Sequence, residues 1–455
     1  MTDNSVEIVF NNFTNFSFNL VAATVADDGS WIQRPPETIA PSQQKVTWGT
    51  VAEDELAGVA GSVTYSTASA GNLVINWNNP LVGFDTNTVS PPLECFFVEG
   101  DSHGDQETIT ISIIPNVPTN WLNESIPSNW MQQNLATLGN RTLQQLCLPA
   151  SHDAGMSVYT AGTIGTVANN TQTQTAGIYG QLVAGARYFD IRPVVILPND
   201  SSDIYTGHFT ATTGNVAGAL GQSLASIIAD INNFTATNNE LIVLEFSHDI
   251  NLPGLLGPLP TWSAVNLDQD LWNVVFTALL GINHLVKDVS YADLLTTSLS
   301  GFIENGPAVF VVIDAELNTP QAPNTITSAY SGIYIVPNGA SSFIPGGGYT
   351  DTNDLSDMMI GQLKLPANIS TGPYFQTSWT LTQTDGEAAL SVVDSSLSIL
   401  SLTQQANSAI GALYQACSSA VFPNVLYVND FGNSKAANLA LAINFSNFAA
   451  TGDQA

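Results

Sequence analysis

The stretch LCLPASHDAG at 146–155 decides how this chain is interpreted, because an apolar, strand-like run ends there in His152 and Asp153. Two further segments have the same form, YFDIR at 188–192 and TGHF at 206–209. Each places groups that can move a proton or hold an anion at the end of a predicted strand. The chain contains only 5 His and 8 Lys plus Arg among its 455 residues, so this grouping stands out from the background.

Around these segments, strand-length apolar runs alternate with helical patterns. The clearest predicted helix covers about Gly214–Asn233, and another covers about Glu387–Cys417. Such alternation predicts a C-terminal α/β (β/α)8 TIM barrel. The barrel should be irregular, because its third strand follows the second too closely for a helix between them. The predicted strands are 143–150, 186–193, 203–208, 240–247, 307–314, 331–337, 375–383 and 424–430.

The part before the barrel differs in pattern. Ile109, Ile111 and Ile113 alternate with polar residues, and several other short strands are separated by turn residues, which predicts an all-β sandwich. The prolines in PNVP at 115–118 mark a boundary, since proline removes a backbone donor and restricts its neighbours. We therefore predict two domains, 1–118 and 119–455.

Composition excludes some partners. The formal net charge is −30, from 38 acidic and 8 basic residues, so nucleic acid is a poor partner and an anionic membrane surface is disfavoured. Three cysteines cannot form a full disulfide framework, and Cys147 is predicted to be a buried thiol. No secretory signal or membrane-spanning segment is predicted, which leaves a cytoplasmic or a leaderless extracellular location.

Reactive groups of a (β/α)8 barrel project from the carboxyl ends of its strands. His152, Arg192 and His208 are predicted to meet there, together with Asp153 and Asp430. This set suits cleavage of a phosphodiester. One neutral imidazole takes a proton, one protonated imidazole gives a proton, and the guanidinium fork matches the phosphoryl oxygens.

These residues also carry a family resemblance. PASHDAG at 149–155 with FDIR at 189–192 resembles the X region of phosphatidylinositol-specific phospholipase C, most closely its bacterial form. SWTLTQ at 378–383 and VLYVNDF at 425–431 resemble the late strands of that superfamily, so the resemblance covers about 125–435. It implies attack by a neighbouring hydroxyl of the substrate, which gives a cyclic phosphate and a released lipid.

The resemblance also implies individual roles. His152 would be the general base, paired with Asp430, and His208 the general acid, supported by Asp153. Arg192 would hold the phosphate, and because bacterial members have an arginine where animal members bind calcium, it implies an enzyme without a cofactor. As an alternative, Asp153, Asp190 and Glu245 offer an oxygen-rich calcium site. The resemblance does not identify the head group of the substrate.

The N-terminal part is similar to aegerolysins, small β-sandwich proteins that bind membrane lipids. The residues that carry this likeness are IVFNNFT at 8–14, GSWIQRPP at 29–36 and GVAGSVTY at 58–65. The resemblance implies a module that docks the barrel on a lipid surface.

The same residues also have possible structural roles. His152 with Asp153 is also a reasonable structural pair, Arg192 a buried ion-pair partner of either nearby aspartate, and Glu245 and His248 structural groups. Two rival functions follow. One is a catalytically inactive lipid-binding or cytolytic protein. The other is a metal-dependent glycerophosphodiesterase.

Overall fold

The structure is a computed structural model, and its description covers most of the chain. The described residues are 4–26, 28–54, 57–68, 71–81, 87–90, 95–99, 106–114, 126–197, 204–212, 215–253, 266–314, 328–336, 348–364, 374–417 and 421–445. The chain divides into two compact units, Met1–Ser125 with Ser408–Gln415 and Ile126–Asn407 with Ala416–Ala455. The predicted boundary at 118/119 lies outside the described residues and stays a prediction.

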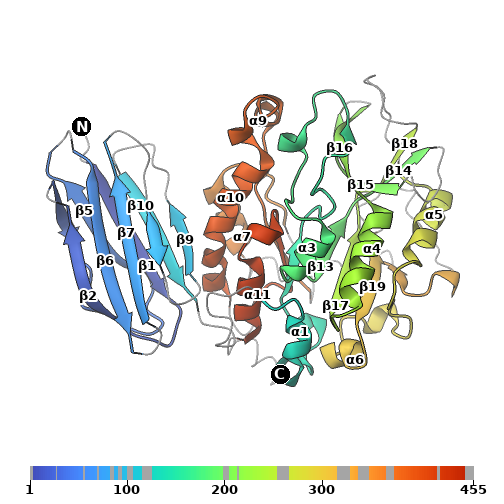
Figure 1. Cartoon of the computed structure of the whole chain (residues 1–455), viewed down its shortest axis with the longest axis horizontal. Coiled ribbons are helices and arrows are strands. Elements are labelled where there is room, and N and C mark those ends of the chain that lie inside the picture. Colours follow the sequence, from blue (N-terminus) through green and yellow to red (C-terminus); the bar gives the residue numbers. More distant parts are fainter. Residues whose placement is uncertain are drawn as a thin grey trace. The chain divides into compact units, whose positions relative to one another are not determined.

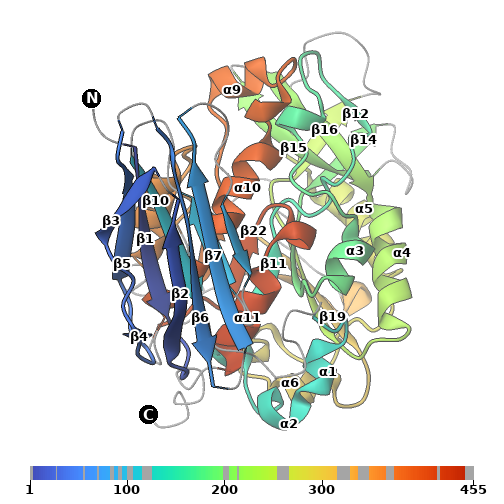
Figure 2. The same cartoon turned by 60° about the vertical axis from the view of Figure 1, so that its left-hand side comes forward.

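The first unit contains two five-stranded sheets (Figures 1 and 2). One has the order β3 (Gly29–Gln33), β5 (Val46–Ala52), β1 (Ser5–Asn12), β10 (Gln106–Ile113) and β9 (Cys95–Glu99). The other has the order β4 (Thr38–Ile39), β2 (Phe18–Val25), β6 (Val59–Thr67), β7 (Gly71–Asn79) and β8 (Thr88–Ser90). The predicted all-β character of this part is confirmed.

Side chains from both sheets form one core. Ile109, Ile111 and Ile113 are fully buried in it, as their alternation predicts. Trp77 from the second sheet crosses the core and its Nε1 donates to Thr50 Oγ1 of the first sheet at 2.9 Å. The buried indole thus satisfies its polar group across the sandwich.

The second unit is built on a seven-stranded parallel sheet. Its central strands are buried on both faces, as expected for parallel strands covered by helices. Seven of the eight predicted strands correspond to this sheet. Its order is β20 (Ile333–Ile335), β19 (Ala308–Ile313), β17 (Leu241–Phe246), β13 (Tyr188–Ile191), β11 (Leu148–Ser151), β22 (Val425–Val428) and β21 (Gln376–Trp379).

The observed sheet differs from the predicted barrel in two ways. Within the described residues the outer strands β20 and β21 do not pair with each other, so no closed barrel is detected. The predicted third strand, 203–208, belongs to a separate sheet, which corrects the prediction. That sheet has the order β12 (Ala161–Gly162), β16 (Asn215–Ser223), β15 (Ile204–Thr212), β14 (Pro193–Leu197) and β18 (Ile250–Pro253).

The predicted helix at about Gly214–Asn233 is wrong in its first half, which is β16. A Cβ at Gly218 would lie 2.1 Å from the carbonyl oxygen of His208, so only glycine lets β16 pair this closely with β15. The second half is α4 (Leu224–Thr235), which begins where the side chain of Ser223 caps the helix. The predicted helix at Glu387–Cys417 is likewise broken into shorter helices.

The helices of the second unit are mostly short. α3 (Ile178–Val183) and α4 pack against each other beside the parallel strands (Figures 1 and 2). No helix in the described part of the chain is long and apolar enough to cross a membrane. The remaining helices are α1 (Trp130–Gln133), α2 (Leu135–Leu138), α5 (Gln269–Leu279), α6 (Leu299–Ile303), α7 (Leu355–Leu363), α9 (Asp385–Leu390), α10 (Ile399–Ala409) and α11 (Ala436–Phe445).

Candidate active site

The candidate site lies where the chain passes from the parallel sheet into the smaller, mixed sheet. His152 and Asp153 directly follow β11, and Asp190 is on β13. Arg192 is the single residue between β13 and β14. β14 pairs with β15, and Gly207 N donates to Arg192 O at 3.0 Å, so this hairpin returns His208 to the same place.

Four of the predicted side chains form one continuous series of contacts. His152 Nε2 lies 2.7 Å from the Arg192 Nη2 atom, and Arg192 Nη1 lies 3.6 Å from Asp153 Oδ2. The same Asp153 oxygen is 2.8 Å from His208 Nδ1. Arg192 and Asp153 thus link the two imidazoles through direct contacts.

The contacts of His152 show which of its two ring nitrogens carries the proton. A guanidinium can only donate, so Nε2 of His152 must accept, and the ring proton must be on Nδ1. Nδ1 then donates to Asn429 Oδ1 at 2.6 Å. Burial of the ring and the charge of Arg192 lower the pKa of His152 from 6.5 to about 4. His152 is thus neutral at physiological pH, as a general base must be.

His208 has a different environment. Its ring is partly exposed, with 24% of the side chain accessible, whereas Asp153 is fully buried. Asp153 has a positive φ of 42°, a conformation that is uncommon outside glycine, and its backbone N–H donates to Asp190 Oδ2 at 2.9 Å. The carboxylate fixes Nδ1 of His208, so Nε2 is the nitrogen left to meet a ligand.

Arg192 is held by two aspartates. Its Nε donates to Asp190 Oδ2 at 3.0 Å, and only 15% of its side chain is exposed. Burial disfavours the charge, but Asp190 and Asp153 more than offset this and raise the pKa of Arg192 above its usual value. Burial likewise disfavours the Asp190 carboxylate, yet Arg192 holds its pKa well below the usual range. The guanidinium is therefore a permanent cation at the site.

The predicted pairing of His152 with Asp430 is wrong. Asp430 accepts from Thr175 Oγ1, and from Asn433 Nδ2 at 3.0 Å, while the neighbouring Asn429 contacts the imidazole. The backbone of Asp430 is left-handed, with a φ of 45°, and this turns its side chain to another partner. Asp430 supports the loop after β22 rather than the base itself.

The three carboxylates of the alternative calcium site have other contacts in this structure. Asp190 and Asp153 are engaged with Arg192, and Glu245 accepts from the Tyr188 hydroxyl at 2.9 Å. Burial and the charge of Asp190 raise the pKa of Glu245 to about 8, so it is mostly protonated at pH 7. Within the described residues, no group of three or more His, Cys, Asp or Glu is placed to hold a metal ion.

Asn429 and Ser247 were not assigned roles from the sequence, and His248 was named only as a structural alternative. Asn429 orients His152, and Ser247 Oγ donates to Asp190 Oδ1 at 2.9 Å. The hydroxyl proton of Ser247 is thereby used, so His248 Nδ1 must donate to Ser247 Oγ, 2.7 Å away. The sequence signal for Ser247 and His248 was their place after β17, beside the strand that carries Asp190.

Comparison with known proteins finds likenesses among solved structures only. No protein-family model matches the chain, and no curated protein matches it. A variant of phosphatidylinositol-specific phospholipase C from Staphylococcus aureus is 13% identical, with a TM-score of 0.45, over 70% of this chain and 98% of that chain. The phosphatidylinositol-specific phospholipase C from Listeria monocytogenes is 15% identical, with a TM-score of 0.41, over 70% of this chain and 98% of that chain.

A third likeness covers a smaller part of the chain. The RahU protein, solved in complex with a TRIS molecule, is 14% identical with a TM-score of 0.20, over 25% of this chain and 97% of that chain. All three TM-scores lie below 0.5, so the likenesses carry no functional conclusion by themselves.

Proposed function

We propose that this chain is a phosphodiesterase of the phospholipase C type, which cleaves a phospholipid head group by general acid–base catalysis. The observation that supports it best is the series of contacts from His152 through Arg192 and Asp153 to His208. A neutral imidazole, a permanent cation and a second imidazole held by a carboxylate are the groups that phosphodiester cleavage needs around one phosphorus atom.

The roles follow from the atoms that are left to meet a substrate. His152 Nε2 accepts the proton of the attacking hydroxyl, which belongs to the head group itself. The new P–O bond closes a cyclic phosphate, while the bond to the lipid oxygen breaks. His208 Nε2 gives its proton to that oxygen and releases the lipid alcohol. Arg192 stabilises the negative charge that develops on the phosphoryl oxygens.

Substrate binding would also activate the base. Without a substrate, Arg192 donates to the same Nε2 that must accept the proton. A phosphate next to Arg192 would take over this donor and partly neutralise the cation that lowers the pKa of His152. The imidazole then becomes a stronger base when the substrate is present.

The remaining parts of the proposal concern architecture and substrate presentation. We infer that the seven-stranded sheet is an irregular relative of the (β/α)8 barrel, and that the aegerolysin-like N-terminal unit docks it on a lipid surface.

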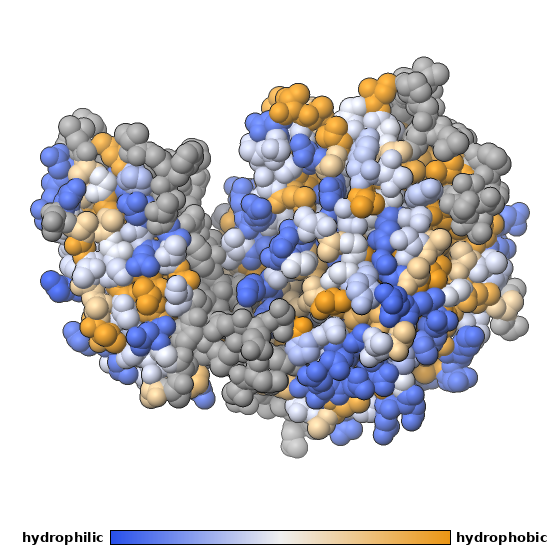
Figure 3. Space-filling view, viewed as in Figure 1, coloured by the Kyte–Doolittle hydropathy of each residue, from blue (hydrophilic) through white to orange (hydrophobic). Residues whose placement is uncertain are grey.

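Figure 3 shows apolar residues gathered where Figure 1 places α9. Leu390, the last residue of α9, and Val392 and Val393 just after it are exposed, Val393 by 86%. Such a group suits contact with lipid more than with water.

The direct test is turnover by the purified full chain. We expect a water-soluble cyclic phosphate and a released lipid alcohol from vesicles of inositol lipids, whose head group carries a hydroxyl next to the phosphate. Choline and ethanolamine lipids, tested one head group at a time, lack this hydroxyl and should release nothing. His152→Ala is the control and should abolish release. Liposome binding without product from any lipid would favour an inactive lipid-binding protein, and loss of activity in a chelator would favour a metal-dependent diesterase.

A further inference from the structure

Three strands that end at the candidate site are followed by the same local backbone. Two residues after the ends of β11, β17 and β22, the chain adopts a left-handed conformation at Asp153, His248 and Asp430. Their φ angles are 42°, 50° and 45°. Left-handed backbone is uncommon outside glycine, and Asp and His are among the residues that adopt it most often. The repetition places the turn after β17 in the same class as the two turns that carry groups of the site.

In each turn, the residue between the strand and the left-handed position is buried. After β11 this residue is His152, the proposed base, and after β22 it is Asn429, which orients the His152 ring. Ser247 holds the equivalent position after β17 and is 2% exposed. By its position, the turn after β17 therefore belongs to the site, although the proposed mechanism uses neither Ser247 nor His248.

The hydrogen bonds of this turn lead to Arg192. His248 Nδ1 donates to Ser247 Oγ at 2.7 Å, and Ser247 Oγ donates to Asp190 Oδ1 at 2.9 Å. The other oxygen of the same carboxylate accepts from Arg192 Nε at 3.0 Å and from the backbone N–H of Asp153 at 2.9 Å. A hydroxyl that accepts a hydrogen bond donates a stronger one, so His248 reinforces the contact between Ser247 and Asp190.

The Asp190 carboxylate needs these donors because it is buried. Only 1% of the residue is exposed, and a buried charge that lacks hydrogen bonds is costly. Tyr427 gives this carboxylate a further hydrogen bond, but Ser247 is the donor to Oδ1. Without the Ser247 hydroxyl, the carboxylate is free to turn, and the direction of the Arg192 fork is no longer fixed.

We propose that Ser247 and His248 are positioning residues, which orient Arg192 through the Asp190 carboxylate. His248 acts through its Nδ1 on Ser247. The alternative is a direct contact between the substrate and Nε2 of His248, whose ring is exposed. The expected effect on turnover rests on the proposed function, whereas the orientation of Arg192 can be measured without a substrate.

The first test measures hydrogen exchange of the arginine Nε–H groups by NMR on the full chain. The chain contains only four arginines, so selective labelling with 15N-arginine gives few signals, and Arg192→Lys identifies the signal of residue 192. Ser247→Ala should speed exchange at Arg192 by about 3- to 10-fold, because the partner of Nε is less firmly held. The signal of Arg187, which is buried against Glu240, reports whether the variant is folded. An unchanged exchange rate at Arg192 would overturn the proposal.

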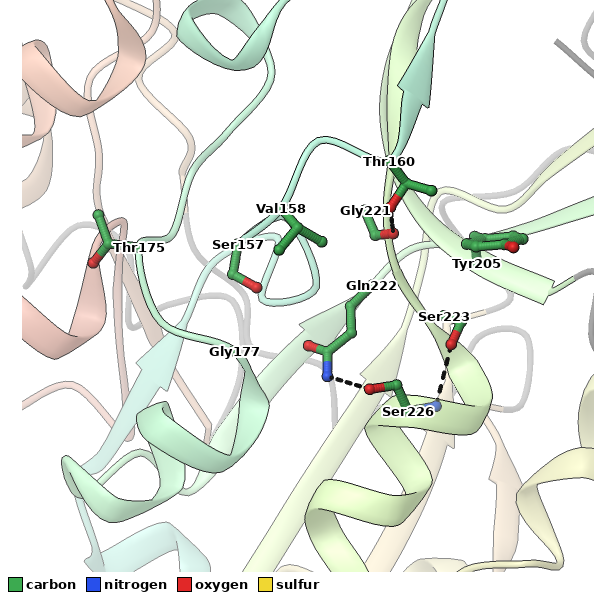
Figure 4. A pocket seen from close by; sticks show the side chains of 10 residues that line it. All are labelled: Ser157, Val158, Thr160, Thr175, Gly177, Tyr205, Gly221, Gln222, Ser223 and Ser226. Carbon is green, nitrogen blue, oxygen red and sulfur yellow. Dashed lines mark hydrogen bonds between the residues drawn. The ribbon is translucent and has the colours of Figure 1, made fainter.

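A matched control removes a serine hydroxyl outside this series. Figure 4 shows Ser226, whose Oγ accepts from Gln222 Nε2 at 3.1 Å. The same Nε2 donates to Asp230 at 2.6 Å, so this group also joins a serine to a carboxylate. Within the described residues, none of the three hydrogen-bonds to Asp190 or Arg192. Ser226→Ala should therefore leave exchange at Arg192 unchanged, and an acceleration equal to that in Ser247→Ala would overturn the proposal.

Two variants of His248 separate the proposal from the alternative. His248→Asn keeps a donor near the position of Nδ1 and tolerates a left-handed backbone, but it has no Nε2. His248→Gly keeps only the backbone freedom. We expect kcat/KM to fall about 10-fold in His248→Gly and to recover to within about 3-fold of the original in His248→Asn. Equal losses in the two variants would assign the ring to the substrate, and no loss in His248→Gly would remove it from the site; either result overturns the proposal.

The control for these variants is His284→Gly. His284 also has a left-handed backbone, with a φ of 63°, and its carbonyl accepts from Val309 N at the amino end of β19, the opposite edge of the sheet. This variant should leave kcat/KM unchanged. If no phosphodiester is cleaved, the exchange rate at Arg192 is measured in the two His248 variants instead. It should rise in His248→Gly and recover in His248→Asn, and equal rates in both would contradict the proposal whatever the reaction of the chain.

Discussion

The two imidazoles of the candidate site differ in almost every contact they make. His152 is buried, its Nδ1 meets the amide of Asn429, and its Nε2 faces the guanidinium of Arg192. His208 is partly exposed, and its Nδ1 meets the carboxylate of Asp153. Burial and the charge of Arg192 favour the uncharged form of His152, whereas the Asp153 carboxylate fixes the orientation of the His208 ring. In the proposed mechanism the first ring takes a proton and the second gives one.

The largest expected effect is a loss of turnover that depends on the leaving group of the substrate, and this dependence distinguishes the general acid from the general base. His208→Ala should lose about 100- to 10,000-fold on an alkyl diester, whose leaving oxygen needs a proton, but far less on a nitrophenyl diester, whose anion leaves unaided. His152→Ala should lose a similar factor on both substrates, because the attacking hydroxyl is the same. Steady-state kcat/KM of both variants on both substrates provides the measurement. Equal losses of His208→Ala on the two esters would remove the general acid from the mechanism.

A stability measurement tests the environment of His152 without turnover. The ring has a pKa of about 4 in the folded chain, against an ordinary value of 6.5, so between these pH values unfolding takes up a proton. Stability from this group is present above pH 6.5 and is lost as pH falls towards 4, by about 3 kcal/mol at most. Denaturant unfolding at pH 7 and pH 4.5 should show a smaller loss for His152→Gln than for the original chain. An identical pH dependence would mean that the ring is not held neutral by burial.

The local motifs predicted the grouping of these side chains because each motif is contiguous in the sequence. His152 and Asp153 follow one strand, Asp190 and Arg192 end another, and parallel strands place their carboxyl ends at one edge. The structure brings His208 next to Asp153, but not on a strand of the parallel sheet as predicted. It arrives on an antiparallel hairpin, and the glycines of β16 that permit this hairpin lie within the range that was predicted to be a helix.

The partner of His152 was beyond a pattern-based prediction. Asn429 and Asp430 are adjacent, and a carboxylate is the more familiar partner of an imidazole. Which of the two faces the ring depends on the left-handed backbone of Asp430, and that is set by contacts with Thr175 and Asn433 from outside the strand. Tertiary contacts of this kind leave no periodic signal in the sequence.

Arg192 contacts both environments, so its replacement probes them together. Its fork spans His152 on one side and Asp190 and Asp153 on the other. Arg192→Lys keeps the charge but cannot reproduce these directions, and we expect kcat/KM to fall more than about 10-fold. The matched control is Arg34→Lys in the first unit, which should leave turnover of a water-soluble diester unchanged, because that substrate needs no lipid surface. Near-original rates for Arg192→Lys would show that a point charge suffices and that the fork has no role in catalysis.

The smallest expected effect is a shift in the pH dependence of kcat/KM when His152 is given the same kind of Nδ1 partner as His208. Asn429→Asp gives His152 a carboxylate, as His208 already has, with almost no change in volume. An anion at Nδ1 favours the protonated ring, so the pKa of His152 should rise from about 4 by about one unit or more. Because the base must be neutral, the acid limb of kcat/KM should move to higher pH by the same amount. A profile that keeps its acid limb in place would show that Asn429 does not set the protonation of the base, and the contrast between the two imidazoles would then depend on Arg192 and burial alone.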